Sequence, residues 1–151
     1  MNLTTTAFHP GGDIPAAHTC EGQDVSPPLA WEGAPEATRS FVLICTDPDA
    51  PMGTWVHWLL FNLPAETRSL LEKFPTDPEL PSGARQGRND FGRTGYGGPC
   101  PPPGPAHRYQ FALYALDARM DLKPGCRRAE VEQAMKGHIL ATAELTGRFS
   151  R

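Results

Sequence analysis

The sequence has 151 residues, a formal net charge of −3 at pH 7, 17 prolines, 15 glycines and 39% hydrophobic residues. This length predicts a single domain, residues 1–151, with a core of its own, and the prolines and glycines favour short strands and turns over long helices. The slightly acidic charge, with no long basic run, excludes a general attraction to nucleic acid.

The ends and the cysteines indicate the cellular compartment. The N-terminal residues 1–8 carry neither a basic region nor an apolar run suited to secretion. No apolar stretch approaches the roughly 20 residues of a membrane-spanning helix, so we expect a soluble cytoplasmic protein without a transmembrane segment. The four cysteines show no C-x-x-C spacing, which argues against structural zinc, and reduced thiols are the general expectation for that compartment.

Two neighbouring segments predict adjacent strands. Residues 40–46 form an apolar run, and residues 55–63 are mostly apolar on both faces, as in a central strand that is covered on both sides. Strict alternation places Trp55 and His57 on one face of the second strand and Trp58 on the other. His57 is therefore expected to be buried and to need a hydrogen-bond partner.

The connection between these two strands gathers chemically active side chains. Asp47 follows the first strand directly, and Trp55 and His57 open the second. An acid, an indole and an imidazole at one strand-to-strand connection build a small polar pocket on a rigid frame. Asp49, in the same connection, is expected to brace the loop rather than to touch a ligand.

A third strand is predicted at residues 107–116, after a loop rich in glycine and proline at residues 95–105. His107, Tyr109 and Phe111 share one face of this strand, so that the face runs from a polar pocket mouth into the core. A long, stiff loop beside strands is usually functional. Its glycines let backbone N–H groups approach a ligand, and its prolines fix its shape.

Helical structure is expected only in short pieces. Residues 66–74 are compatible with a helical turn, and residues 128–136 have the apolar spacing of a short helix ended by Gly137. Residues 138–149 alternate like a final strand, although an alanine-rich helix that continues from residue 128 fits almost as well.

Four motifs stand in order along the chain: Asp47-Pro48-Asp49-Ala50-Pro51, Trp55-x-His57-Trp58, Gly98-Pro99-Cys100-Pro101-Pro102 and His107-Arg108-Tyr109. Together they resemble the phosphatidylethanolamine-binding protein family, and more narrowly its bacterial and archaeal branch of Raf kinase inhibitor-like proteins. The resemblance covers nearly the whole chain. It implies a mainly β fold, an antiparallel β-sandwich with Greek-key connections and a few short peripheral helices.

The resemblance also implies a small pocket for phosphate, phosphorylated head groups or similar anions, with no cofactor and no catalytic residue. The residues that match the family's pocket are Asp47, Trp55, His57, Cys100, Pro101, Pro102, His107 and Tyr109. Asp47 is expected to orient an imidazole and favour its charged form, while both imidazoles and a loop N–H, such as that of Cys100, donate to the anion. Pro103 replaces a lysine of many members and Ala141 a tyrosine of the animal members, which implies a more open pocket.

Several alternatives stay open at this stage. Cys20 and Cys100 both lie in loop motifs of the family, and a disulfide between them is one alternative to reduced thiols. A thiol hydrolase would use Cys100 with His107, or orient a base with Asp47 and His57. Two histidines and a carboxylate also suit zinc or non-haem iron. The resemblance favours a non-enzymatic binding protein, and it allows a kinase or protease partner and a homodimer.

Overall fold

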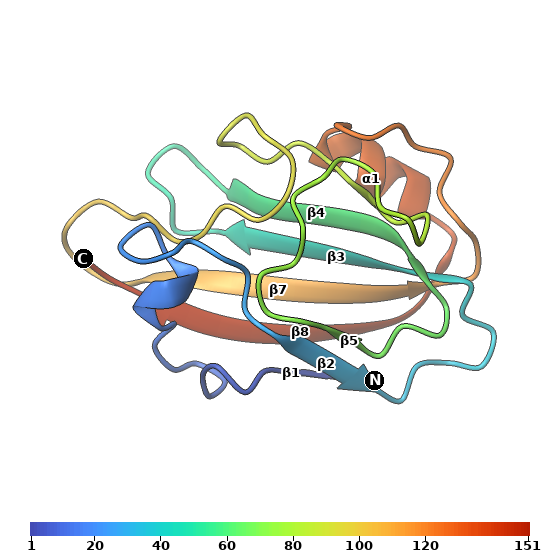
Figure 1. Cartoon of the computed structure of the whole chain (residues 1–151), viewed down its shortest axis with the longest axis horizontal. Coiled ribbons are helices and arrows are strands. Elements are labelled where there is room, and N and C mark those ends of the chain that lie inside the picture. Colours follow the sequence, from blue (N-terminus) through green and yellow to red (C-terminus); the bar gives the residue numbers. More distant parts are fainter.

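The fold is a sandwich of two antiparallel β-sheets, described for residues 1–151 by a computed structural model (Figure 1). The strands are β1 (Asn2–Thr4), β2 (Leu29–Glu32), β3 (Ser40–Asp47), β4 (Trp55–Pro64), β5 (Ser69–Leu70), β6 (Arg85–Gln86), β7 (His107–Leu116) and β8 (Ile139–Phe149). One short helix, α1 (Arg128–Met135), and a 3-10 turn, η1 (Ala16–His18), accompany them. The predicted mainly β sandwich with a few short helices is confirmed.

The larger sheet follows a Greek-key path. Its order is β6-β4-β3-β7-β8, and the smaller sheet has the order β1-β2-β5. Within the larger sheet β7 returns to pair with β3, on the side away from β4, which gives the Greek-key order β7-β3-β4-β6. Since these strands are antiparallel, the end of β3 meets the starts of β4 and β7 at one end of the molecule (Figure 1).

Two apolar layers cover the two faces of the larger sheet. The inner layer lies between the sheets and includes Phe41, Trp58 and Leu113 together with Trp31 from β2. The outer layer lies between the sheet and α1. It includes Ile44, Leu59, Phe61, Val131 and Met135. Both faces of β3 and β4 are buried, which explains why the sequences of these two strands are almost entirely apolar.

A β-bulge at the start of β4 changes the facing that strict alternation predicts. The pairing of β3 with β4 shifts between Val56 and Trp58, which leaves His57 without a partner across the ladder. The ring of His57 packs edge-on against the ring of Tyr109, with a distance of 5.2 Å between the centroids. This places His57 on the inner face of the larger sheet, the same face on which Trp58 is buried. The prediction that alternation separates His57 from Trp58 is therefore wrong, because a bulge re-aims the side chain.

The structure also decides the segments that the sequence left ambiguous. Residues 139–149 form strand β8, so the favoured prediction of a strand for residues 138–149 is confirmed except at His138. The hydrogen bonds of β8 to β7 stabilise it as a strand and not as a helix. Residues 66–74 contain no helix. Leu70 of β5 pairs with Leu29 of β2, so sheet pairing overrides the weak helical pattern there. No peptide bond is cis. Neither helix has the length and hydrophobicity that crossing a membrane requires.

Candidate ligand-binding site

A cavity of about 190 Å³ lies at the end of the sheet where β3, β4 and β7 meet. It is lined by Asp47, Ala50, Pro51, Trp55, His57, Phe91, Cys100, Pro101, Pro102, His107 and Tyr109. All eight residues that the sequence proposed for the pocket are in this set. The structure brings them together, and their binding of a ligand remains a prediction. Pro103 and Ala141, the two departures from the family pattern, do not line the cavity.

Asp47, which is buried, and His107, which is partly exposed, form a pair across neighbouring strands. Asp47 is only 3% exposed. Its Oδ2 accepts a hydrogen bond from Nδ1 of His107 at 2.7 Å, and its Oδ1 accepts one from the backbone N–H of Asp49 at 2.8 Å. Because a carboxylate only accepts, Nδ1 of His107 carries the hydrogen and its Nε2 remains without a partner in the chain. Asp47 thus orients an imidazole, as expected.

His57 is held by a backbone carbonyl instead of a carboxylate. Its Nδ1 donates to the carbonyl oxygen of Gly97 at 2.6 Å. Burial lowers the pKa of His57, against the opposing influence of this hydrogen bond and of the charge of Asp47. The ring is therefore neutral at pH 7, with its hydrogen on Nδ1 and a lone pair on Nε2. The expectation that both imidazoles donate to an anion is not supported at neutral pH, because Nε2 of His57 is an acceptor.

Three hydrogen-bond donors on residues that line the cavity have no partner within the chain. They are Nε1–H of Trp55, the hydroxyl of Tyr109 and the backbone N–H of Cys100. Burial first, and then the charge of Asp47, raises the pKa of Tyr109, so its hydroxyl keeps its hydrogen. The donors of Trp55 and Tyr109 are buried, and an unpaired buried donor costs roughly 1–3 kcal/mol, which a ligand with acceptor oxygens would recover.

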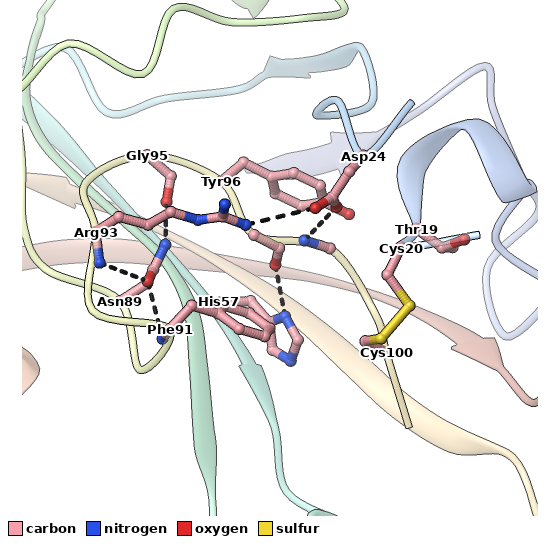
Figure 2. A network of polar contacts seen from close by, with 12 residues as sticks. Thr19, Cys20, Asp24, His57, Asn89, Phe91, Arg93, Gly95, Tyr96 and Cys100 are labelled. Carbon is pink, nitrogen blue, oxygen red and sulfur yellow. Dashed lines mark hydrogen bonds and ion pairs between the residues drawn. A yellow bond between two sulfur atoms is a disulfide. The ribbon is translucent and has the colours of Figure 1, made fainter. Parts of the chain in front are cut away.

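Residues 95–105, which we name the covering loop, form one wall of the cavity through Cys100 and Pro101. A disulfide joins Cys100 to Cys20, with an S–S distance of 2.12 Å and a Cα–Cα distance of 5.4 Å (Figure 2). The general expectation of reduced thiols is therefore wrong for this pair and holds for the buried Cys45 and Cys126. The disulfide ties the covering loop to the segment after η1.

Polar contacts hold the covering loop as well (Figure 2). The carboxylate of Asp24 accepts a hydrogen bond from the backbone N–H of Gly98 at 2.8 Å, and the hydroxyl of Tyr96 donates to the carbonyl oxygen of His18 at 2.7 Å. Asn89 donates from its side chain to the carbonyl oxygen of Gly95 at 2.9 Å. These bonds fix the backbone that presents the Gly97 carbonyl to His57.

The opposite wall belongs to the β3–β4 connection, residues 48–54, which we name the hairpin loop. Asp49 accepts hydrogen bonds from Nε and from the backbone N–H of Arg108, both at 2.9 Å. The hydrogen bonds from Arg108 lower the pKa of Asp49 to about 2. Asp49 does not line the cavity, so it braces the loop as expected.

The structure gives no support to the two enzymatic alternatives. Cys100 is bonded to Cys20, so it offers no free thiolate as a nucleophile. No group of three or more histidine, cysteine or acidic side chains has the arrangement of a metal site. His57 and His107 are each committed through Nδ1 to a different partner, Gly97 and Asp47.

Sequence reasoning missed several residues that shape the site. Phe91 lines the cavity and packs edge-on against Trp55 and His57, at centroid distances of 5.5 and 5.4 Å. It lies in the motif Asn89-Asp90-Phe91-Gly92, which offered a signal for it. Asp24 and the carbonyl of Gly97 had no such signal, because their contacts join segments far apart in the chain.

Comparison with known proteins agrees with this fold. The profile described as Phosphatidylethanolamine-binding protein matches residues 4–150. The chain belongs to this family of binding proteins. It is 50% identical over 151 residues to a UPF0098 protein of Methanothermobacter thermautotrophicus, with 100% of this chain and 99% of that protein covered. It is 42% identical over 158 residues to the UPF0098 protein YbhB of Escherichia coli, with 99% of this chain and 100% of that protein covered.

Two solved structures share the whole fold. One is the phosphatidylethanolamine-binding protein homolog CT736 of Chlamydia trachomatis, with a TM-score of 0.90 and 39% identity over 99% of this chain and 97% of that one. The other is Escherichia coli YbcL, described as a member of the mammalian family, with a TM-score of 0.91 and 37% identity over 99% and 98% of the two chains. The resemblance of the motifs to the phosphatidylethanolamine-binding protein family is confirmed.

Proposed function

We propose that the protein is a non-enzymatic binding protein whose cavity takes phosphate or a phosphorylated small molecule or head group. One observation carries the proposal: the cavity residues hold donors that lack partners, namely Nε1–H of Trp55, the Tyr109 hydroxyl and the Cys100 N–H. A phosphoryl group offers several strong acceptor oxygens in different directions, which matches such a set. The cavity of about 190 Å³ suits a small head group.

His107 supplies the positive charge in this proposal. Its Nδ1 hydrogen is committed to Asp47, so Nε2 becomes a donor when the ring takes up a second proton. The Asp47–His107 pair then carries no net charge, and the anion meets a donor instead of a carboxylate alone. A kinase or protease partner is compatible with this proposal, because Pro51, which lines the cavity, and its neighbour Met52 are both exposed.

The test is a calorimetric titration of the purified protein with inorganic phosphate, for which we expect measurable binding. His107→Gln removes the ring whose Nε2 has no partner in the chain and should lower the affinity. Absence of phosphate binding by the wild type would contradict the proposal.

A further inference from the structure

His57 offers the cavity a hydrogen-bond acceptor. Its Nδ1 donates to the Gly97 carbonyl oxygen at 2.6 Å (Figure 2). The N–H of Gly97 donates back to the carbonyl oxygen of His57 at 2.9 Å. A carbonyl oxygen cannot donate, so the hydrogen must stay on Nδ1. The residue is 3% exposed and lines the cavity, and its Nε2 has no partner in the chain. The free lone pair of Nε2 is therefore available to a ligand in the cavity.

The surroundings of the ring keep it neutral. Tyr109 on β7 and Phe91 pack edge-on against it, and both are uncharged. The charges that act on the ring come from Asp47 on β3 and from Asp24 and Asp90 in loops, and they favour the protonated form. Burial has the larger effect and lowers the pKa of His57. The two carboxylates in loops are themselves engaged, Asp24 with Gly98 N–H and Asp90 with the backbone N–H of β4 at 2.6 Å.

We propose that His57 determines the specificity of the cavity: its Nε2 accepts a hydrogen bond from a protonated ligand oxygen, so the site selects singly protonated phosphate monoesters. Anions of equal charge that carry no proton, such as sulfate monoesters and phosphodiesters, are discriminated against. This inference rests on the proposed function and names the ligand class within it.

Phosphate monoesters, sulfate monoesters and phosphodiesters differ in what they can offer to Nε2 of His57. A singly protonated phosphate monoester has one P–OH donor for Nε2 of His57, and its other oxygens accept from the free donors of Trp55 and Tyr109. A sulfate monoester has acceptor oxygens only and would place one against the lone pair of Nε2. A buried acceptor that loses its partner costs enough to change an affinity by about tenfold or more.

The first experiment compares three ligands on the full chain by calorimetry near pH 6. Methyl phosphate, whose second pKa is about 6, is then about half singly charged, and methyl sulfate and dimethyl phosphate are wholly singly charged. We expect methyl phosphate to bind at least about tenfold more tightly than the other two. A second comparison, of inorganic phosphate with inorganic sulfate, shows whether the preference for phosphate also holds for free anions. Dimethyl phosphate represents the phosphodiester of a lipid head group.

The outcomes of this comparison are distinct. Binding of methyl sulfate or dimethyl phosphate as tight as that of methyl phosphate would overturn the inference and leave the proposed function in place. If neither the three ligands nor inorganic phosphate binds, both the inference and the proposed function are overturned. A preference shared by inorganic phosphate and methyl phosphate supports the inference for free and esterified phosphate alike.

Matched variants assign the preference to one ring. His57→Gln places an amide that can donate near the position of Nε2, so the preference for methyl phosphate over methyl sulfate should fall to within about threefold. His107→Gln, the same substitution on the other imidazole, should weaken both ligands and keep their ratio. A His57→Gln variant that keeps the full preference would overturn the assignment.

A measurement on the wild type avoids any question of misfolding. Nitrogen NMR of the imidazoles should show His57 with a hydrogen on Nδ1 and none on Nε2. As the pH is lowered until His57 takes up its second proton, Nε2 becomes a donor, and methyl sulfate should gain affinity relative to methyl phosphate. A hydrogen on Nε2 at pH 7, or a preference that still grows once His57 carries its second proton, would overturn the inference.

Discussion

The two loops that form opposite walls of the cavity are held by different kinds of interaction. The covering loop is tied by the Cys20–Cys100 disulfide, by the carboxylate of Asp24 and by the hydrogen bonds between His57 and Gly97. The hairpin loop is braced at Asp49, whose ion pair with Arg108 is exposed to solvent. Met52 at its tip is 94% exposed. One wall is thus anchored covalently and by buried bonds, and the other from the surface.

Local sequence explains this difference. The hairpin loop joins two strands, β3 and β4, whose pairing extends to the two residues that flank the loop, Asp47 and Trp55. The ends of the loop are therefore held together by the sheet, and the loop needs little further stabilisation. The covering loop is long and rich in glycine and proline, and it has few apolar side chains with which to pack into the core. It therefore needs polar and covalent anchors. The rigid wall is the one that fixes the tautomer of His57, and the hairpin loop is the wall that we expect to move when a ligand enters.

The largest expected effect is the loss of the disulfide. Cys20→Ser combined with Cys100→Ser should lower the free energy of unfolding by about 2–4 kcal/mol, because the bond closes a loop with a sequence separation of 80 residues. Urea denaturation of the wild type and the double variant measures the change. Adding a dithiol reductant should destabilise the wild type and leave the double variant unaffected. Equal midpoints for both proteins would show that the covering loop does not depend on this anchor.

A smaller effect concerns pH and the His57–Gly97 anchor. The pKa of His57 is lowered by burial from its ordinary value of 6.5, so below that pH the unfolded chain takes up a proton more readily than the folded protein. The free energy of unfolding should therefore fall as the pH falls from 6.5 toward the folded-state pKa, by at most about 1.4 kcal/mol per pH unit. Denaturation of the wild type against His57→Gln isolates this slope, and parallel curves would contradict it.

The smallest effect is expected for the hairpin loop, and two arginines offer a matched pair. Arg108 pairs with Asp49 at 2.9 Å and Arg93 pairs with Asp24 at 3.5 Å, and both side chains are 59% exposed. Arg108→Ala and Arg93→Ala should each change the free energy of unfolding only slightly, because an exposed ion pair contributes little to stability.

The two variants should differ in ligand exchange. Arg108→Ala loosens the hairpin loop and should speed phosphate dissociation, whereas in Arg93→Ala the disulfide and the Gly98 bond still hold the covering loop. Line-shape NMR of a phosphate titration measures both rates. Faster dissociation in Arg93→Ala than in Arg108→Ala would reverse the comparison between the two walls.

Much of the candidate site could be predicted from the sequence because its residues sit in strong local patterns. Asp47 and Trp55 flank one short connection, and His107 and Tyr109 share the face of a strand with clear alternation. Their convergence on one cavity follows from the antiparallel pairing of β3 with both β4 and β7. The weak helical pattern of residues 66–74 failed because pairing with β2 stabilises the strand β5 instead.

By itself the sequence determined the strands around the cavity, the family and the eight candidate residues, since apolar alternation, turn residues and short motifs are local properties of the chain. Only the tertiary structure decided which nitrogen of His57 is free, through the bulge in β4 and the carbonyl of Gly97. It also decided that Cys20 reaches Cys100. The physical reason is that hydrogen-bond partners and thiol distances depend on how distant segments pack, and local patterns carry no record of that packing.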